Sequence, residues 1–320
     1  MAALHQQAAG RRAALRRPAT ATDDTAIRLV FPGSEVIAPS AVAGLASPRG
    51  ARADAARHLW PAGLPVSYAL VGGACGGWRE TQQAIVRESI ARWQEAGARI
   101  GFVEVADPAA ALVRIGNVTG AGNWSWLGAT ALDARSDLTA NLDIDCTTAE
   151  GRVAAMQLIG HIIGMRPAVP EASLPGWDPQ SIMQVAPQGL RRSGIAANES
   201  LSAGDQRWLQ ACYGQPVPLG TVRRGDILML PGDGPDQIDA DIDGPLSGKC
   251  RIAVYPPIDA RLFAVERRAA GADRIIAWAE SKGLKTPLSV EFRPDPDARY
   301  RLTLRSWYRP ADAFAQLHVS

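Results

Sequence analysis

The stretch QLIGHIIGMRP (157–167) contains one side chain with catalytic or metal-binding chemistry, the imidazole of His161. On a helix, Gln157 lies one turn earlier on the same face. A catalytic zinc needs three protein ligands and an open position for water. The amide of Gln157 is a poor zinc ligand, Leu158 cannot act as a general base, and Pro167 has no side-chain donor. His161 is therefore the only metal ligand that this stretch offers.

A lone histidine on an apolar helix is more often a packed, hydrogen-bonded core residue than a ligand. The chain contains 4 histidines, so replacement ligands would have to come from His5, His58 or His318, all distant in the sequence. We therefore expect no bound cofactor.

Two helices and a set of strands must position this stretch. The run AAMQLIGHIIGM (154–165) is apolar nearly all round, which is typical of a buried helix. In ETQQAIVRESIARWQEAG (80–97), apolar residues repeat at helical spacing and Gly97 supplies a stop. A third helix is expected in LSAGDQRWLQACYG (201–214), which begins with a Ser N-cap candidate. Alternating apolar residues predict strands that could pair into one sheet, in 57–70, 100–105, 111–117 and 141–145.

After about residue 216 the pattern changes to short extended runs between Pro, Gly and Asp clusters. These runs predict strands in 226–230, 250–255, 289–292 and 300–308. Their spacing favours a small β-sandwich, although 261–283 could hold a helix. We therefore divide the chain into a mobile leader (1–55, with one strand candidate at IRLVF, 27–31), a first domain (56–214) and a β-rich domain (215–320).

The composition is that of an ordinary globular protein. Hydrophobic residues make up 47% of the 320, charged residues 21%, and the net charge is +2. This balance does not indicate a nucleic-acid-binding protein. No apolar run approaches the ~18 to 20 residues that a transmembrane helix needs. The basic amino terminus has no apolar signal-peptide core, so the sequence as written predicts a cytoplasmic protein.

Five stretches in order carry a resemblance to a known family. They are WPAGLPVSY, IARWQEAG with RIGF, NWSWLGATAL, QLIGHIIGM, and SIMQV with LSAGDQRWLQACYG. Together they resemble the metzincin clan of zinc metallopeptidases, most closely its bacterial astacin-like branch, over residues 57–214. The resemblance implies an α+β fold, with a twisted sheet and two or three helices in the first domain. It also implies secretion.

The family motif H-E-x-x-H-x-x-G-x-x-H is degenerate in this chain. His161 matches its second histidine and Gly164 its glycine. The first histidine, the glutamate and the third histidine correspond to Gln157, Leu158 and Pro167. Met183 corresponds to the Met-turn methionine beneath the metal, and Val185 to a tyrosine two residues later. A family cysteine is replaced by Asn123. The cleft residues that the resemblance implies are Trp124, Ser125, Trp126, Gln157, His161 and Val185.

These departures predict a pseudo-peptidase that keeps a peptide-binding cleft without zinc or hydrolysis. In this fold an extended substrate pairs with a sheet edge above the active-site helix, and such strand addition needs backbone groups rather than a metal. The expected partner is a peptide or protein, and the oligomeric state is open. One alternative is an active zinc endopeptidase with a rearranged ligand set. Another is an interaction protein that acts through its carboxyl-terminal β-domain.

Overall fold

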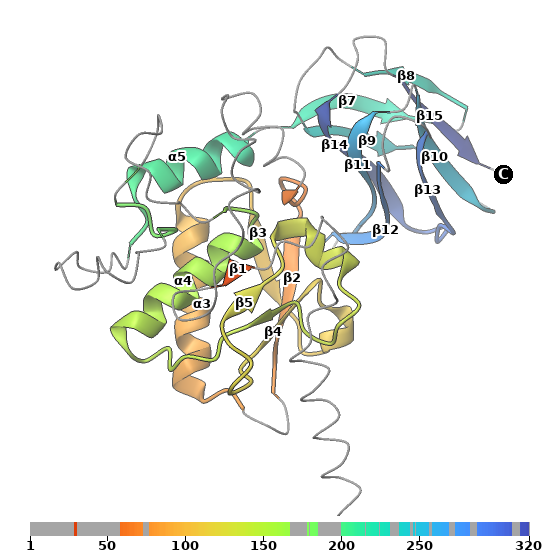
Figure 1. Ribbon diagram of the computed structural model, residues 1–320. Coiled ribbons are helices and arrows are strands. Elements are labelled where there is room, and N and C mark those ends of the chain that lie inside the picture. The colour runs from red at the N-terminus through yellow and green to blue at the C-terminus, as the bar shows by residue number, and fades with distance from the viewer. Residues whose placement is uncertain are drawn as a thin grey trace, which may run out of the picture. The chain divides into compact units, whose positions relative to one another are not determined.

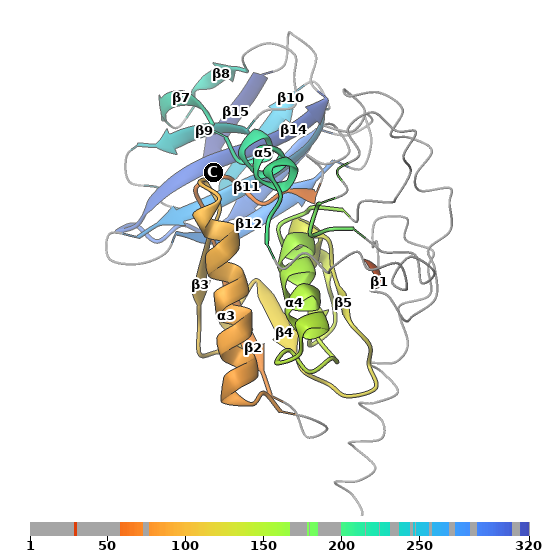
Figure 2. The same cartoon turned by 90° about the vertical axis from the view of Figure 1, so that its left-hand side faces the viewer.

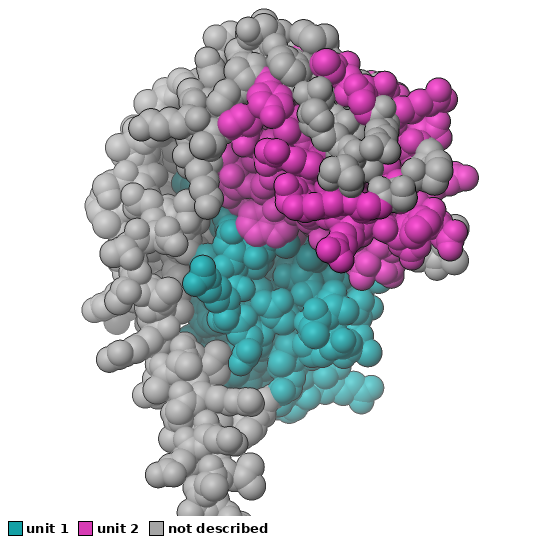
Figure 3. Space-filling model, turned by 90° about the vertical axis from the view of Figure 1, so that its right-hand side faces the viewer, with its two compact units in different colours: residues 1–40, 66–211 teal, residues 41–65, 212–320 magenta. Residues whose placement is uncertain are grey.

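The computed structural model describes most of the chain between His58 and Val319. The described residues are 29–30, 58–72, 77–166, 178, 180–184, 200–214, 216–223, 225–230, 237–243, 246, 248–255, 258–268, 273–281, 287–308 and 314–319. Pro167, Val185 and the leader apart from Leu29–Val30 lie outside these residues. The chain divides into two compact units, residues 1–40 with 66–211 and residues 41–65 with 212–320 (Figure 3).

A mixed six-stranded sheet forms the framework of the first unit. Its order is β1-β5-β6-β4-β2-β3. The strands are β1 (Leu29–Val30), β2 (Pro65–Val71), β3 (Gly101–Glu104), β4 (Val113–Gly116), β5 (Trp124–Ser125) and β6 (Ala140–Asn141). β2 runs parallel to β4 and β4 parallel to β6, whereas β5 is antiparallel to β6 and β1 antiparallel to β5. The leader strand β1 thus lies outside β5 at one edge of the sheet.

Three α-helices accompany this sheet. α3 (Glu80–Glu95) and α4 (Ala149–Ile162) pack against each other, and Figures 1 and 2 show them on the same side of the sheet. α3 buries Val86, Ile90 and Trp93, and the chain leaves it through Gly97, whose φ of 76° suits a glycine. α5 is Ala203–Cys212. Two short 3₁₀-helices are η2 (Pro108–Ala110) and η3 (Gly128–Asp133).

The second unit is built from two antiparallel-rich sheets around one core. Their orders are β13-β10-β15-β8 and β12-β11-β14-β9-β7. The strands are β7 (Val217–Val222), β8 (Ile227–Met229), β9 (Gln237–Ile242), β10 (Cys250–Tyr255), β11 (Asp259–Arg267), β12 (Arg274–Glu280), β13 (Leu288–Phe292), β14 (Arg299–Tyr308) and β15 (Phe314–Val319). Buried side chains of both sheets, including Ile252 and Leu262, share one apolar cluster.

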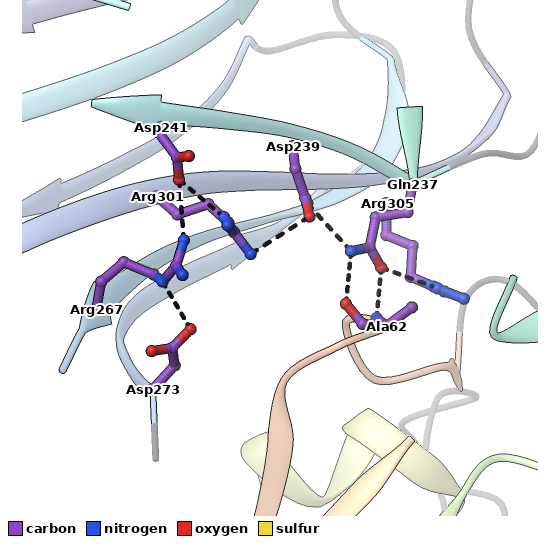
Figure 4. Close-up of polar contacts among 8 residues, drawn as sticks. All are labelled: Ala62, Gln237, Asp239, Asp241, Arg267, Asp273, Arg301 and Arg305. Carbon is purple, nitrogen blue, oxygen red and sulfur yellow. Dashed lines mark hydrogen bonds and ion pairs between the residues drawn. The ribbon is translucent and has the colours of Figure 1, made fainter. Parts of the chain in front are cut away.

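A chain of polar contacts crosses β9, β14 and β11 in this unit (Figure 4). Asp241 accepts from Arg267 at 3.1 Å and from Arg301 at 3.0 Å. Further along β9, the Gln237 side chain bonds both backbone groups of Ala62, at 2.5 Å to the amide and 3.0 Å to the carbonyl. The segment before β2 is therefore tied to the second unit by hydrogen bonds.

The molecule is α+β, and most of the predicted elements are present. The strands predicted in 57–70, 100–105 and 111–117 correspond to β2, β3 and β4. The predicted strand 141–145 is wrong after Asn141, because the amides of Asp143 and Ile144 bond to the Asn123 side chain at 2.7 and 3.2 Å.

The helix considered for 261–283 is also wrong. That stretch contains β11 and β12, which pair with each other. Alternate residues such as Leu262 and Ala264 enter the core of the second unit, and this period of two suits a strand. Among the described residues, no helix combines the length and apolarity that crossing a bilayer requires.

Candidate functional site

The middle of α4 carries the residues that the family motif singles out. His161 is buried, and its Nδ1 lies 2.9 Å from the carbonyl oxygen of Met165. Since a carbonyl can only accept, Nδ1 carries the proton in this contact. Burial lowers the pKa of His161 to about 4, against the smaller opposing effect of the Met165 carbonyl. His161 is therefore a neutral imidazole at neutral pH.

Gln157 stands one helical turn before His161 and ties α4 to the segment 181–184. Its Nε2 donates to the carbonyl oxygens of Ile182 at 2.9 Å and Gln184 at 3.0 Å. The side chain is only 6% exposed. Both N–H groups of the amide are therefore used, and the position where the family has a zinc ligand holds a backbone clamp.

Asp205 of α5 holds the same segment from its other side. This carboxylate is 1% exposed and accepts from the Ser181 hydroxyl at 2.5 Å, the Ile182 amide at 2.9 Å and the Ser202 amide at 3.0 Å. Ser202 in turn accepts from the Asp205 amide at 2.9 Å. This reciprocal pair is the capping-box arrangement of a helix start. Residues 181–184 are thus fixed by α4 and α5 together.

Met183 packs directly on the helix between its two motif positions. A Cβ added to Gly160 would lie 2.3 Å from the Met183 sulfur and 2.9 Å from Cζ2 of Trp93. The indole of Trp93 donates to the carbonyl oxygen of Met156 at 2.9 Å. Only a residue without a side chain fits at Gly160, so Gly160 lets α4, Met183 and α3 approach closely.

The described residues do not fit a catalytic zinc. Leu158, at the position of the general base, is fully buried and has no proton-transferring group. Gln157 presents N–H donors to carbonyls, which leaves His161 as the one ligand of zinc-binding type on α4. No group of three or more His, Cys, Asp or Glu side chains is close enough to hold a metal within the described ranges. We derive no metal-dependent step for this site.

The three cleft residues predicted on the NWSW stretch lie at and beside β5, which contacts α4. Trp124 belongs to an apolar cluster with Val118 and Leu138. Ser125 has a fully buried hydroxyl that has no hydrogen-bond partner in the described part of the chain. The Trp126 amide donates to the Thr139 carbonyl at 2.9 Å and extends the pairing with β6.

Polar side chains hold the turn before β5. The Asp143 carboxylate accepts from the amides of Gly120 and Gly122, both at 2.9 Å through Oδ2. Asn141 bonds Val118 through both backbone groups, at 2.9 Å to the amide and 3.2 Å to the carbonyl. Asn123, which replaces a family cysteine, therefore belongs to a network that anchors this turn by hydrogen bonds.

The structure brings together Gln157, His161 and Met183 of the predicted set, and it places Trp124, Ser125 and Trp126 on the neighbouring strand. Asp205 and Ser181 were missed by the sequence analysis. The Ser-x-x-Asp pattern at 202–205 was a detectable signal, because it is typical of a helix start. Its second role, binding residues 181–184, depends on tertiary contacts that no local pattern encodes.

No family model and no curated protein matches this chain. Three solved structures are similar to parts of it. They are the pre-peptidase C-terminal domain of collagenase from Bacillus anthracis (15% identity, 33% of this chain and 99% of that one, TM-score 0.25), PliG, a periplasmic lysozyme inhibitor from Aeromonas hydrophila (10%, 33% and 100%, 0.25), and the Yersinia pseudotuberculosis-derived mitogen (11%, 30% and 87%, 0.22). Similarities at these TM-scores support no inference about function.

Proposed function

We propose that this chain is a pseudo-peptidase of the astacin-like metzincin type, which binds extended peptides and does not hydrolyse them. The observation that carries the proposal is the clamp made by Gln157. Its amide donates to Ile182 at 2.9 Å and Gln184 at 3.0 Å, so the side chain is committed to holding residues 181–184. A structural amide replaces a ligand, while helix and Met-turn segment stay in contact.

The general base is lost at the same place. A hydrolase of this type needs a carboxylate that accepts a proton from water and returns it to the leaving amine. Leu158 is buried and apolar. His161 does not replace it, because burial lowers its pKa to about 4 and its Nδ1 already bonds the Met165 carbonyl. The chemistry of these side chains supports binding rather than catalysis.

Peptide binding is supported by the position of β5. This strand lies near one edge of the sheet, contacts α4, and carries the predicted cleft residues Trp124 and Ser125. An extended peptide can add to a strand through backbone hydrogen bonds, and no metal is needed for that step.

The test is a panel of labelled apolar decapeptides incubated with the full chain in the presence of zinc. We expect binding without cleavage. Strand addition uses backbone N–H groups, so N-methylation of alternate residues should abolish binding in one of the two alternation frames. Zinc-dependent cleavage, or binding that ignores N-methylation in both frames, would contradict the proposal.

One observation favours an active zinc peptidase with a rearranged ligand set. The His161 Nδ1 donates to a backbone carbonyl at 2.9 Å, and metal-binding histidines commonly orient their rings by such a bond. The two proposals differ in metal content, since the active form requires stoichiometric zinc.

A further inference from the structure

The leader contributes one strand to the sheet, and that strand covers β5. Leu29 lies opposite Ser125 and Val30 opposite Trp124, in antiparallel register. Without β1, β5 would be the edge strand, because the order of the sheet begins β1-β5-β6. The edge proposed to bind peptides is thus occupied by residues of the chain itself.

The backbone geometry shows which groups β1 covers. The Trp126 amide donates to the Thr139 carbonyl at 2.9 Å, so this residue directs its backbone groups toward the β6 side. Backbone groups of successive residues in a strand point to opposite sides. The amide and carbonyl of Ser125 therefore point away from β6, toward β1, where Leu29 is the register partner. The Leu29 amide faces β5, and the Val30 amide faces away from it.

We propose that residues 27–31 are a built-in peptide ligand of the β5 edge, and that an external extended peptide binds by displacing them. This inference rests on the proposed function, since it assumes that the edge receives peptides. The recognised partner is an extended, apolar segment that pairs antiparallel with β5, as IRLVF does.

Two features suit displacement. The pairing spans two residues on each strand, and so short a pairing contributes little stability by itself. A longer peptide can pair along more of the edge. A long segment also separates Val30 from Pro65, where β2 begins, so β1 can leave without moving β2. The tether keeps the leader at a high effective concentration, which weakens the apparent affinity for external peptides.

The sequence of the leader strand fits such a ligand. IRLVF is rich in β-branched and other apolar residues, which favour strands. Pro32 follows immediately and, having no amide hydrogen, cannot donate to a continuing ladder. A short apolar strand with a defined end is the class of peptide that the edge would accept.

The experiment compares two proline variants of the full chain. Leu29→Pro removes the amide that faces β5, whereas Val30→Pro removes one that faces away and is tolerated at an edge. The probe is a fluorescein-labelled peptide with the sequence TAIRLVFPGS (residues 25–34). We expect Leu29→Pro to bind the probe at least about tenfold more tightly than the parent chain, and Val30→Pro to bind it like the parent.

Hydrogen exchange supplies a second measurement that does not depend on the probe. Exchange in a proteolytic fragment containing Ser125 should accelerate at least about tenfold in Leu29→Pro and stay unchanged in Val30→Pro, because only the first variant exposes the Ser125 amide. Adding the probe to Leu29→Pro should restore protection. Protection that disappears on dilution of the parent chain would show that the leader of a second copy fills the edge, and would overturn the proposal.

The remaining outcomes separate this inference from the proposed function. If the parent chain binds peptides as tightly as Leu29→Pro does, peptide binding stands and the built-in ligand is wrong. If exchange accelerates in Leu29→Pro but no peptide binds, the leader covers an edge that receives no ligand, and both proposals fail. Equal exchange in the parent and both variants would contradict the pairing itself.

Discussion

The side-chain Nε2 of Gln157 lies 2.9 Å from the carbonyl oxygen of Ile182, so a residue in the position of a zinc ligand joins α4 to the Met-turn segment. Asp205 reaches the same residue from α5, through the Ile182 amide at 2.9 Å. The segment beneath the expected metal site is thus held on both sides by hydrogen bonds. A site stabilised in this way does not need a metal to keep its shape.

Replacing Gln157 should destabilise the protein. Gln157→Leu keeps the approximate volume but leaves the carbonyls of Ile182 and Gln184 without these donors. We expect the free energy of unfolding to fall by about 2 to 4 kcal/mol, measured by urea denaturation. The same change at the exposed Gln206 is the control and should have little effect. A fall no larger than that of the control would show that the clamp is unimportant.

Asp205→Asn should disrupt the second attachment. An amide supplies one acceptor oxygen where the carboxylate supplies two, and its NH₂ group would face the Ser181 hydroxyl or the Ile182 amide. We expect a loss of about 2 to 4 kcal/mol in the free energy of unfolding. Asp107→Asn is the matched control, because Asp107 is the exposed cap of η2 and asparagine caps equally well. Equal stability of the two variants would contradict the role of Asp205.

Gly160 and Met183 should show strong coupling in a double-mutant cycle. Gly160→Ala places a Cβ 2.3 Å from the Met183 sulfur, which should cost about 1 to 3 kcal/mol despite the better helix propensity of alanine. After Met183→Ala the same Cβ has more room. We expect the cost of Gly160→Ala to fall by at least about 1 kcal/mol in that background. Additive effects would indicate that the two residues do not touch.

His161 should make stability depend on pH. Its pKa is lowered from 6.5 to about 4 in the folded protein, so the unfolded state binds more protons between these values. The contribution is complete above pH 6.5 and is lost as the pH falls toward 4. Comparison with His161→Leu isolates it. The difference in unfolding free energy between the parent and this variant should fall by roughly 2 to 3 kcal/mol from pH 7 to pH 4.5. A difference that is constant over this range would contradict the burial of His161.

The elements around the site could be predicted where a local pattern encodes them. Helical spacing in 80–97 and the apolar run 154–165 indicated α3 and α4, because periodicity reports which face is buried. The two-residue strands β5 and β6 are too short to show a period, and tertiary pairing decides where they end.

The site itself divides in the same way. The spacing of Gln157 and His161 on one helix follows from the sequence, since residues four apart share a face. Which group Gln157 bonds does not follow, because its partners at Ile182 and Gln184 come from another segment. The leader strand was a candidate from its apolar residues, but its partner β5 became visible only in the sheet.

Zinc content tests the central claim most directly. The untagged full chain is incubated with excess zinc, passed through a desalting column, and analysed by inductively coupled plasma mass spectrometry, with its melting temperature measured before and after a chelator. Because His161 is the one α4 ligand of zinc-binding type, we expect well under one equivalent of zinc and no shift in melting temperature. One retained equivalent, together with a melting temperature that falls on chelation, would contradict the pseudo-peptidase and favour an active zinc enzyme.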